Sequence, residues 1–438
     1  MPGGGSKPPP APFSSARGIR SSSAKSVRMR RGELESRILI LVTLALVAFG
    51  IVCVYSATSA PAAVGGGNPN YYVERQGMYA ILGIVLMVLA QRWDYRRLRS
   101  LAPALVVASL VLLAAVLVIG PAVNGARRWI SVGPAVFQPS ELAKLAVAVW
   151  AAAYLSRRPP PRTLKQLARP IGLLAGLYAL LLLAEPDLGT AITLFVMLGA
   201  VLLVAGTPAR LLALAMLIAG AVGTLAIWIE PYRRARFFSF LHPWHDAQGT
   251  GFQTVQAMIG MGSGGVFGVG LGNGIAKLFY LPEAPTDMML ASIGEELGLV
   301  GVTGVIFAYA VFAYAGFRIA LGCRDPFGKR LAVGLTMLVC GQAAVNIAAV
   351  MGLAPLTGIP LPFLSYGGSS LVVLLAAVGI LLNIAARGNA ETASVRDRGR
   401  GDGRARPARA RSGGRPAGTR RVRDDRRVAG SSRGATRP

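Results

Sequence analysis

Charged residues are scarce in this sequence. They make up 15% of its 438 residues, whereas hydrophobic residues make up 53%. A soluble globular domain carries roughly a quarter of charged residues, so the composition excludes a soluble enzyme. Lipid tails accept an apolar surface that water rejects. The composition therefore predicts an integral membrane protein.

Cysteine and histidine are also rare. The three cysteines lie in two apolar runs and one short basic loop, so no disulfide framework is visible. The two histidines, His242 and His245, have no third ligand nearby, which favours interfacial packing over a metal site. The glycine-rich stretch 260–274 lacks the Gly-Lys-Ser/Thr ending of a phosphate-binding loop. We therefore expect no nucleotide cofactor.

Acidic residues are outnumbered, 19 against 46 Lys and Arg, which gives a net charge of +27. Two tails carry 17 of these charges. Residues 1–37 hold eight basic and two acidic residues, and residues 387–438 hold sixteen Arg and five acidic residues. Both tails are rich in Gly, Pro, Ser and Arg and have almost nothing to bury. They are predicted to be disordered and cytoplasmic, attracted to anionic lipid headgroups rather than to nucleic acid.

Ten apolar runs of near-membrane length lie between the two tails. They cover residues 38–57, 77–91, 101–120, 140–156, 171–185, 188–206, 209–229, 288–316, 330–351 and 364–386. The expected fold is therefore an all-α integral membrane protein of about ten transmembrane helices, with its membrane domain at 38–386.

The loops between these runs predict the orientation. Residues 91–100 contain four Arg and residues 156–170 contain five Lys or Arg, whereas the alternate loops are weakly basic. Basic loops stay in the cytoplasm, so both termini are predicted to be cytoplasmic. The one large loop on the outer side is 230–287, and its aromatic and glycine content is typical of an interfacial or re-entrant layer.

Polar residues gather next to the fourth predicted span. Arg127 and Arg128 lie on the outer side, against the general charge bias, which indicates an anionic partner, above all for Arg128. Glu141 and Lys144 are three residues apart on one helix face. Either they form an ordinary ion pair with a snorkelling lysine, or Lys144 binds a ligand; the sequence leaves both readings open.

Two further outer positions carry carboxylates. Glu185 and Asp187 lie in a three-residue turn, where they favour capping of the next helix, with a metal or sugar contact as the alternative. Asp287 ends the large outer loop, four residues after Glu283. It is either the N-cap of the eighth span or a base whose pKa is raised by apolar surroundings.

The sequence resembles the SEDS family of bacterial cell-wall proteins, the FtsW and RodA group, over roughly 35–387. The resemblance is carried by eight motifs that follow in order on the ten-span frame. They are residues 125–130, 138–144, 185–190, 236–244, 272–274, 280–287, 293–298 and 358–370.

The resemblance implies an activity. The family polymerises lipid II, a disaccharide-pentapeptide on undecaprenyl pyrophosphate, into β-1,4-linked glycan strands at the outer face of the plasma membrane. Its catalytic aspartate corresponds to Asp287, with inversion in a single displacement. The family usually continues Asp-Phe-Ile-Phe, whereas this chain has Asp287-Met-Met-Leu, and it often has His or Gln at Pro285 and Asn at His242. These departures keep the acid but change its surroundings.

The resemblance also implies substrate contacts, a cation and partners. The residues expected to bind substrate are Arg127, Arg128, Glu141, Lys144, Glu185, Asp187, Gln256, Lys277 and Glu283. Basic side chains or a divalent cation, Mg²⁺ or Mn²⁺, are expected to hold the pyrophosphate. The expected partners are a class B penicillin-binding protein, which is a transpeptidase, and other division proteins.

Three alternatives stay open: a flippase for lipid II, the RodA-type polymerase of cell elongation, and a scaffold that only recruits the transpeptidase. Division at the septum is favoured because the long basic tails and the 236–244 pattern are FtsW-like.

Overall fold

The computed structural model describes residues 17–63, 70–122, 125–133, 135–229, 231–277 and 283–401. The chain divides into two compact units, Met1–Ala393 and Ser394–Pro438. The first unit contains the helical bundle.

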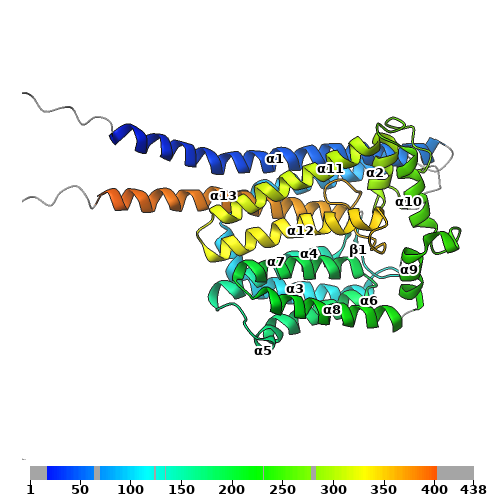
Figure 1. The fold of residues 1–438 in the computed structure, drawn as a ribbon, viewed down its shortest axis with the longest axis horizontal. Coiled ribbons are helices and arrows are strands. Elements are labelled where there is room, and N and C mark those ends of the chain that lie inside the picture. Colours follow the sequence, from blue (N-terminus) through cyan, green and yellow to red (C-terminus); the bar gives the residue numbers. More distant parts are fainter. Residues whose placement is uncertain are drawn as a thin grey trace, which may run out of the picture. The chain divides into compact units, whose positions relative to one another are not determined.

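Ten long helices form the bundle (Figure 1). They are α1 (Arg17–Ala63), α2 (Asn70–Arg92), α3 (Leu98–Ile119), α4 (Pro139–Arg157), α6 (Leu173–Ala184), α7 (Leu188–Ala205), α8 (Ala209–Ile229), α11 (Met289–Gly322), α12 (Pro326–Val350) and α13 (Gly368–Gly401). Each contains or closely overlaps one of the ten predicted apolar runs, which confirms the predicted fold class.

Nine helical segments within the described residues are long and apolar enough to cross a membrane by length and composition; the one that contains α6 runs from Leu164 to Ala184. The tenth, α4, falls outside this set because it carries Glu141, Lys144 and Arg157 in 19 residues. It lies inside the bundle, where it packs against α3, α7 and α12. Its neighbours, rather than lipid, therefore provide its apolar surroundings.

Shorter elements connect the long helices. They are the 3-10 turns η1 (Tyr95–Arg97) and η3 (Pro243–Asp246), the helices α5 (Leu164–Leu167), α9 (Pro231–Leu241) and α10 (Phe252–Ser263), and the π-helical turn η2 (Ala168–Gly172). An antiparallel hairpin pairs β1 (Ile130–Val132) with β2 (Ala135–Phe137). The end of the bundle with this hairpin, α9 and α10 is called the hairpin end.

Two helices extend into the predicted tails. Helix α1 begins at Arg17 and α13 continues to Gly401. Residues 1–16 and 402–438 lie outside the described residues. The disorder of the two tails stays a prediction.

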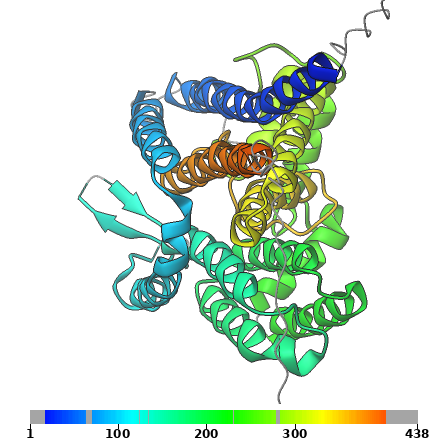
Figure 2. The same cartoon turned by 90° about the vertical axis from the view of Figure 1, so that its left-hand side faces the viewer.

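Helix α12 is at the centre of the bundle, and α13 lies between it, α1 and α2 (Figure 2). Small residues allow close helix contacts. A Cβ at Gly334 would lie 3.1 Å from Val201 of α7, and one at Gly83 of α2 would lie 2.5 Å from Leu375 of α13. The tight packing fixes the ends of α11 and α12, on which the polar residues described below depend.

Helix α1 begins, and α13 reaches Ala393, at the end of the bundle opposite to the hairpin end (Figure 1). Ion pairs hold them there. Arg318 Nε of α11 lies 3.4 Å from Glu35 Oε1 of α1, and Arg387 Nη1 of α13 lies 2.8 Å from Asp94 Oδ2. The bundle has an even number of long helices, so the chain enters and leaves it at the same end.

Helix α11 is interrupted at Gly298, where φ is 65° and ψ is −158°. The interruption frees backbone groups that must be satisfied inside the protein. The segment 265–270 satisfies them: Val269 N donates to the carbonyl of Glu295 at 3.1 Å, and Leu299 N donates to the carbonyl of Gly265 at 2.9 Å. The end of the large predicted outer loop is thereby attached to α11.

A buried ion pair completes this attachment. Lys277 Nζ lies 2.6 Å from Glu296 Oε1 and donates to Ser56 Oγ of α1 at 3.1 Å. Ser56 Oγ donates to the Glu296 carboxylate at 2.6 Å. The side chains of Lys277 and Glu296 are almost fully buried. The pair therefore connects α1, α11 and the segment that leads towards Asp287.

We predict that Lys277→Met lowers the stability of the protein by about 3–5 kcal/mol, because Glu296 would keep a buried charge without its counter-ion. The double variant Lys277→Met/Glu296→Met should regain most of that loss. Apparent melting temperatures in detergent measure both. A double variant that is no more stable than Lys277→Met would show that the ion pair is not the source of the effect.

Candidate active site

Asp287 lies in a turn directly before α11, and its carboxylate does not cap that helix. The N-cap is Met288, which makes no side-chain cap hydrogen bond. The turn is closed by Glu283, whose φ is 57° and whose carbonyl accepts from Thr286 N at 3.1 Å. The Asp287 carboxylate accepts from Thr286 Oγ1 at 3.3 Å. Of the two readings of the sequence, the helix cap is therefore disfavoured.

The surroundings of Asp287 raise the pKa of its carboxyl to about 6. Burial is the main cause, and the negative charge of Glu283 is the second. Arg236 of α9 acts in the opposite direction. A carboxylate with such a pKa is mostly ionised at neutral pH but more basic than an ordinary aspartate. It is suited to accept a proton from a hydroxyl group.

Arg128 faces the same small space as Asp287. A Cβ at Gly358 would lie 3.8 Å from Arg128 Nη1 and 3.9 Å from Asp287 Oδ2, and Gly358 has a φ of 69°. The guanidinium is held from behind, because Nε donates to the carbonyl of Glu185 at 3.0 Å and Nη2 donates to that of Pro186. A fixed cation and a base therefore border one gap, which is kept open by a glycine.

Two amides of α12 hold the other side of this gap. Asn346 Nδ2 donates to the carbonyls of Asp287 and Ile359, each at 2.8 Å. Gln342 Nε2 donates to the carbonyl of Pro360 at 2.9 Å. Our sequence reasoning missed both residues. Their signal was available, since two polar side chains four apart in an apolar span form one polar helix face.

Lys144 and Glu141 form a buried pair that is joined to this network. Lys144 Nζ lies 2.8 Å from Glu141 Oε1 and donates to Gln342 Oε1 at 2.6 Å. The Lys144 side chain is 1% exposed. The lysine does not snorkel, and its ammonium is engaged within the protein. It supports Gln342 rather than facing Asp287 directly.

Glu185 and Asp187 have different environments although only Pro186 separates them. Asp187 caps α7: its Oδ1 accepts from Thr190 N at 3.0 Å and its Oδ2 accepts from Thr190 Oγ1 at 2.7 Å. Glu185 is fully buried, and among the described residues neither of its carboxylate oxygens has a hydrogen-bond partner. Burial, followed by repulsion from Asp187, raises the pKa of Glu185 to about 8, while Arg128 opposes the rise.

Three other predicted residues are not brought to Asp287 by any described contact. Arg127 is exposed, and its Nη1 donates to the carbonyls of Leu117 and Val118 at the end of α3. Lys277 is engaged by Glu296, as described above. Gln256 is half-buried on α10. Their predicted contact with substrate stays a prediction.

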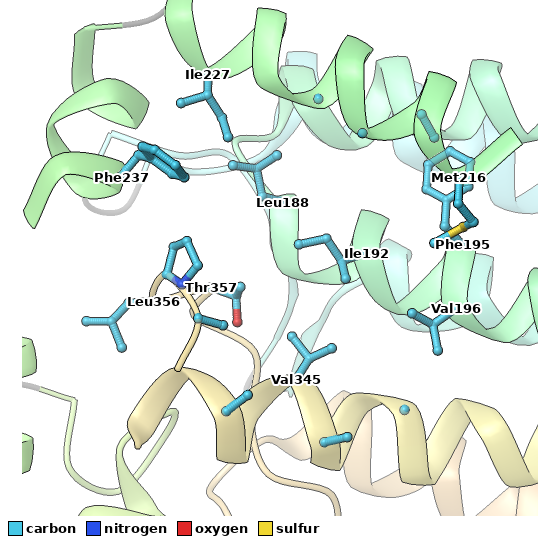
Figure 3. Close-up of a pocket in the computed structure, with 18 of the residues that line it drawn as sticks. Leu188, Ile192, Phe195, Val196, Met216, Ile227, Phe237, Val345, Leu356 and Thr357 are labelled. Atoms are coloured by element: carbon cyan, nitrogen blue, oxygen red, sulfur yellow. The ribbon is translucent and has the colours of Figure 1, made fainter. Parts of the chain in front are cut away.

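An apolar groove of about 640 Å³ lies beside this site (Figure 3). Leu188 and Ile192 of α7, Met216 and Ile227 of α8, and Val345 of α12 line it. Pro186 and the segment 354–357 line it as well, and Arg236 is the charged residue among the described lining residues. The lining thus includes Thr357, next to Gly358 in the chain, and Pro186, whose carbonyl accepts from Arg128.

The predicted divalent cation has no ready-made protein site among the described residues. No group of three or more His, Cys, Asp or Glu lies there in an arrangement that could hold a metal ion. The acidic side chains near the gap are instead engaged separately, Asp187 by Thr190 and Glu141 by Lys144. We therefore derive no step through a cation, and the cation stays a prediction.

The environment of Glu185 predicts a pH-dependent effect. The pKa is raised from 4.5 to about 8 in the folded protein, so ionisation favours the unfolded state. Stability is therefore lost as pH rises from about 4.5 to 8. Glu185→Gln removes this loss. Its apparent melting temperature should match wild type near pH 5 and exceed it at pH 8. Glu74→Gln, an exposed control on α2, should show no such trend. A difference in melting temperature between Glu185→Gln and wild type that does not change with pH would contradict the raised pKa of Glu185.

Comparison with known proteins places this site in context. A family model described as a cell cycle protein, FtsW/RodA/SpoVE, matches residues 36–390. A relative from Geobacter sulfurreducens, described as a probable peptidoglycan glycosyltransferase FtsW, is 43% identical over 354 residues, which are 80% of this chain and 95% of the relative. The stage V sporulation protein E of Bacillus subtilis is 38% identical over 79% of this chain and 96% of its own length.

Solved structures agree with this match. One chain, from work on the structural coordination of polymerization and crosslinking by a peptidoglycan synthase complex, is 34% identical with a TM-score of 0.67; the match covers 80% of this chain and 97% of that one. The rod shape determining protein RodA of Thermus thermophilus is 32% identical with a TM-score of 0.58, over 80% and 95% of the two chains. This chain therefore belongs to the FtsW/RodA/SpoVE family of membrane proteins.

Proposed function

We propose that this protein is a peptidoglycan glycosyltransferase that polymerises lipid II into β-1,4-linked glycan strands. The observation that carries the proposal is the gap at Gly358, where the Asp287 carboxylate and the Arg128 guanidinium face one another beside an apolar groove. The names of the FtsW relatives support the same reaction.

The reaction needs a base and a stabilised leaving group. Asp287 accepts the proton of the acceptor's 4-hydroxyl group as its oxygen forms a bond to the anomeric carbon of the donor sugar. The bond between that carbon and the pyrophosphate oxygen breaks, and the pyrophosphate leaves on its lipid. Arg128, with its Nη1 directed towards Gly358, stabilises the negative charge. A single displacement converts the α-linked donor into a β-linked product.

The groove suits the lipid part of the substrate. A prenyl chain is a long apolar group without hydrogen-bonding atoms, and apolar side chains of α7, α8 and α12 line the groove. Arg236 lies where the groove meets the site. The prenyl chain thus lies in the apolar groove, while its pyrophosphate reaches Arg128 and Arg236.

This assignment fixes the proposed orientation. The hairpin end faces the outside of the plasma membrane, where lipid II is polymerised, and both termini are cytoplasmic. The charge bias of the loops supports this orientation, as does the position of the start of α1 and of Ala393 in α13 opposite to the hairpin end. The FtsW relatives favour a place at the division septum over the RodA-type role in elongation.

A partner transpeptidase follows from the same reaction, because glycan strands need crosslinking. We propose a class B penicillin-binding protein, together with other division proteins; a structural relative comes from a complex that coordinates polymerization and crosslinking. A lipid II flippase is the rival function. The glycosyltransferase description of the FtsW relatives, together with a base at the site, favours the polymerase.

The central test replaces Asp287 by Asn. Asn keeps the shape and the hydrogen bonds but cannot accept the proton, so polymerisation of purified lipid II should fall by about 10²–10⁴, with lipid II binding retained and a melting temperature no lower than that of wild type. Asp246→Asn, in the exposed turn after α9, is the matched control and should stay active. Near-normal polymer from Asp287→Asn would reject the general-base role, and wild type that binds lipid II without polymerising it would favour the flippase.

The pKa of Asp287 predicts the pH dependence of the reaction. Only the ionised carboxylate accepts a proton, so kcat/KM should fall about tenfold per pH unit below pH 6 and level off above it. Glu283 contributes to the raised pKa by charge repulsion. Glu283→Gln should therefore move the break to lower pH. A break that stays in place in this variant, or that lies near pH 4 in wild type, would contradict the described environment.

A further inference from the structure

Three tyrosine rings pack together next to the turn that carries Asp287. Tyr71 and Tyr72 lie in the first turn of α2, and Tyr366 lies in the segment between α12 and α13. The rings of Tyr71 and Tyr72 are edge-to-face with centroids 5.4 Å apart, and those of Tyr72 and Tyr366 are edge-to-face at 5.0 Å. We call Tyr71, Tyr72 and Tyr366 the tyrosine platform.

The tyrosine platform is accessible. Tyr71 is 45% exposed and Tyr72 is 38% exposed, whereas large aromatic side chains in a packed core are almost fully covered. Aromatic rings at the membrane surface often serve only as interfacial anchors. Such anchors need no contact with one another, but these three rings form a continuous aromatic surface from two distant parts of the chain.

The tyrosine platform is attached directly to the active site. Tyr366 N donates to the carbonyl of Pro285, two residues before Asp287, at 2.7 Å. Gln76 Nε2 of α2 donates to the carbonyl of Ser365 at 3.3 Å. Both halves of the aromatic surface are therefore held in fixed register with the turn that carries the base.

A cation accompanies the rings. The guanidinium carbon of Arg75 lies 4.5 Å from the centroid of the Tyr71 ring. Burial raises the pKa of the Tyr366 hydroxyl, and Arg75 opposes that rise, which places Arg75 near this hydroxyl as well. The surface thus combines partly exposed tyrosine rings, packed edge to face, with hydroxyl groups and a guanidinium that lies over the face of Tyr71. Such a combination fits a pyranose ring, with its C–H faces and equatorial hydroxyls.

The connecting segment 351–367 joins the groove, the gap and the tyrosine platform along the chain. Its first part, 354–357, lines the groove; Gly358 borders Asp287 and Arg128; and Tyr366 completes the platform. Groove, base and aromatic surface therefore follow one another along a single stretch of chain. A polymerase that holds its lipid in the groove must lead its sugar chain away on the other side of the base.

We propose that the tyrosine platform is a glycan-binding subsite, which holds pyranose rings of the growing β-1,4-linked strand beyond the sugar that reacts. This inference rests on the proposed function and adds to it a place for the polymer. The subsite does not act on the reacting atoms. It retains the strand between successive additions, so its loss shortens the product without slowing the first coupling.

The test compares the first coupling of lipid II with the length of the polymer. Tyr72 contacts both other rings, so Tyr72→Ala should shorten the mean strand length about three- to tenfold, in line with the loss of one aromatic stacking contact. Its rate of forming the first disaccharide-disaccharide product should stay within about twofold of wild type. Tyr72→Trp, which retains a ring, should restore length.

Tyr55→Ala is the matched control. Tyr55 is 51% exposed and lies towards the C-terminal end of α1. If exposed tyrosines act only as membrane anchors, Tyr55→Ala and Tyr72→Ala should shorten the strands equally. That result would overturn the subsite. If Tyr72→Ala lowered the rate of the first coupling as much as the strand length, and lowered the melting temperature as well, the Tyr72 ring would have a structural role instead.

A binding measurement separates this inference from the proposed function. Chitotetraose, a soluble β-1,4-linked oligosaccharide, is used as the probe in saturation-transfer NMR with the purified full chain. Binding that Tyr72→Ala abolishes and Tyr72→Trp retains supports the subsite even if the chain alone does not polymerise lipid II. Unchanged binding in Tyr72→Ala, or no binding to wild type, overturns it, whatever the polymerase assay shows.

Discussion

Irregular backbone inside a membrane protein must find hydrogen-bond partners within the protein, and this constraint shapes the site. The segment between α12 and α13 is non-helical, and its residues 359 and 361–365 are buried. Its carbonyls at Ile359 and Pro360 accept from Asn346 and Gln342 of α12. Asn346 also binds the carbonyl of Asp287. The Asn346 amide therefore sets the distance between Asp287 and the segment that faces it. Lys144 donates to Gln342, the other amide of α12 that holds this segment.

The same constraint leaves the Asp287 carboxylate available for chemistry. Asn346 engages its backbone, Thr286 gives one long hydrogen bond to its side chain, and Met288 takes the N-cap position. Glu185, in contrast, is enclosed and has a pKa of about 8, against about 6 for Asp287. Two carboxyls in one region thus differ in protonation at neutral pH. The ionised one faces the gap, and the protonated one reduces the number of negative charges that a pyrophosphate would meet.

The helices could be predicted from the sequence because bilayer thickness sets their length, and that information is local. Contacts between residues that are far apart in the sequence could not be predicted in this way. Lys277 was predicted to bind substrate, yet its ammonium pairs with Glu296 on α11 and with Ser56 on α1. Nothing near Lys277 in the chain marks either partner. Gln342 and Asn346 form a polar helix face that is visible in the sequence, but the carbonyls that they bind lie across the fold and could not be inferred from it.

The segment 351–367 connects the parts of the site in a way that limits how the enzyme can move. Its backbone is held at both faces, by the α12 amides and by the bond from Tyr366 N to Pro285, and its glycine at position 358 occupies a conformation that side chains rarely adopt. A segment fixed at so many points is poorly suited to open and close over substrate in each cycle. Polymer growth would then depend on movement of the substrates: lipid exchanges along the groove while the strand advances past a stationary base. A rigid surface beyond that base is the arrangement that retains a strand during such an exchange.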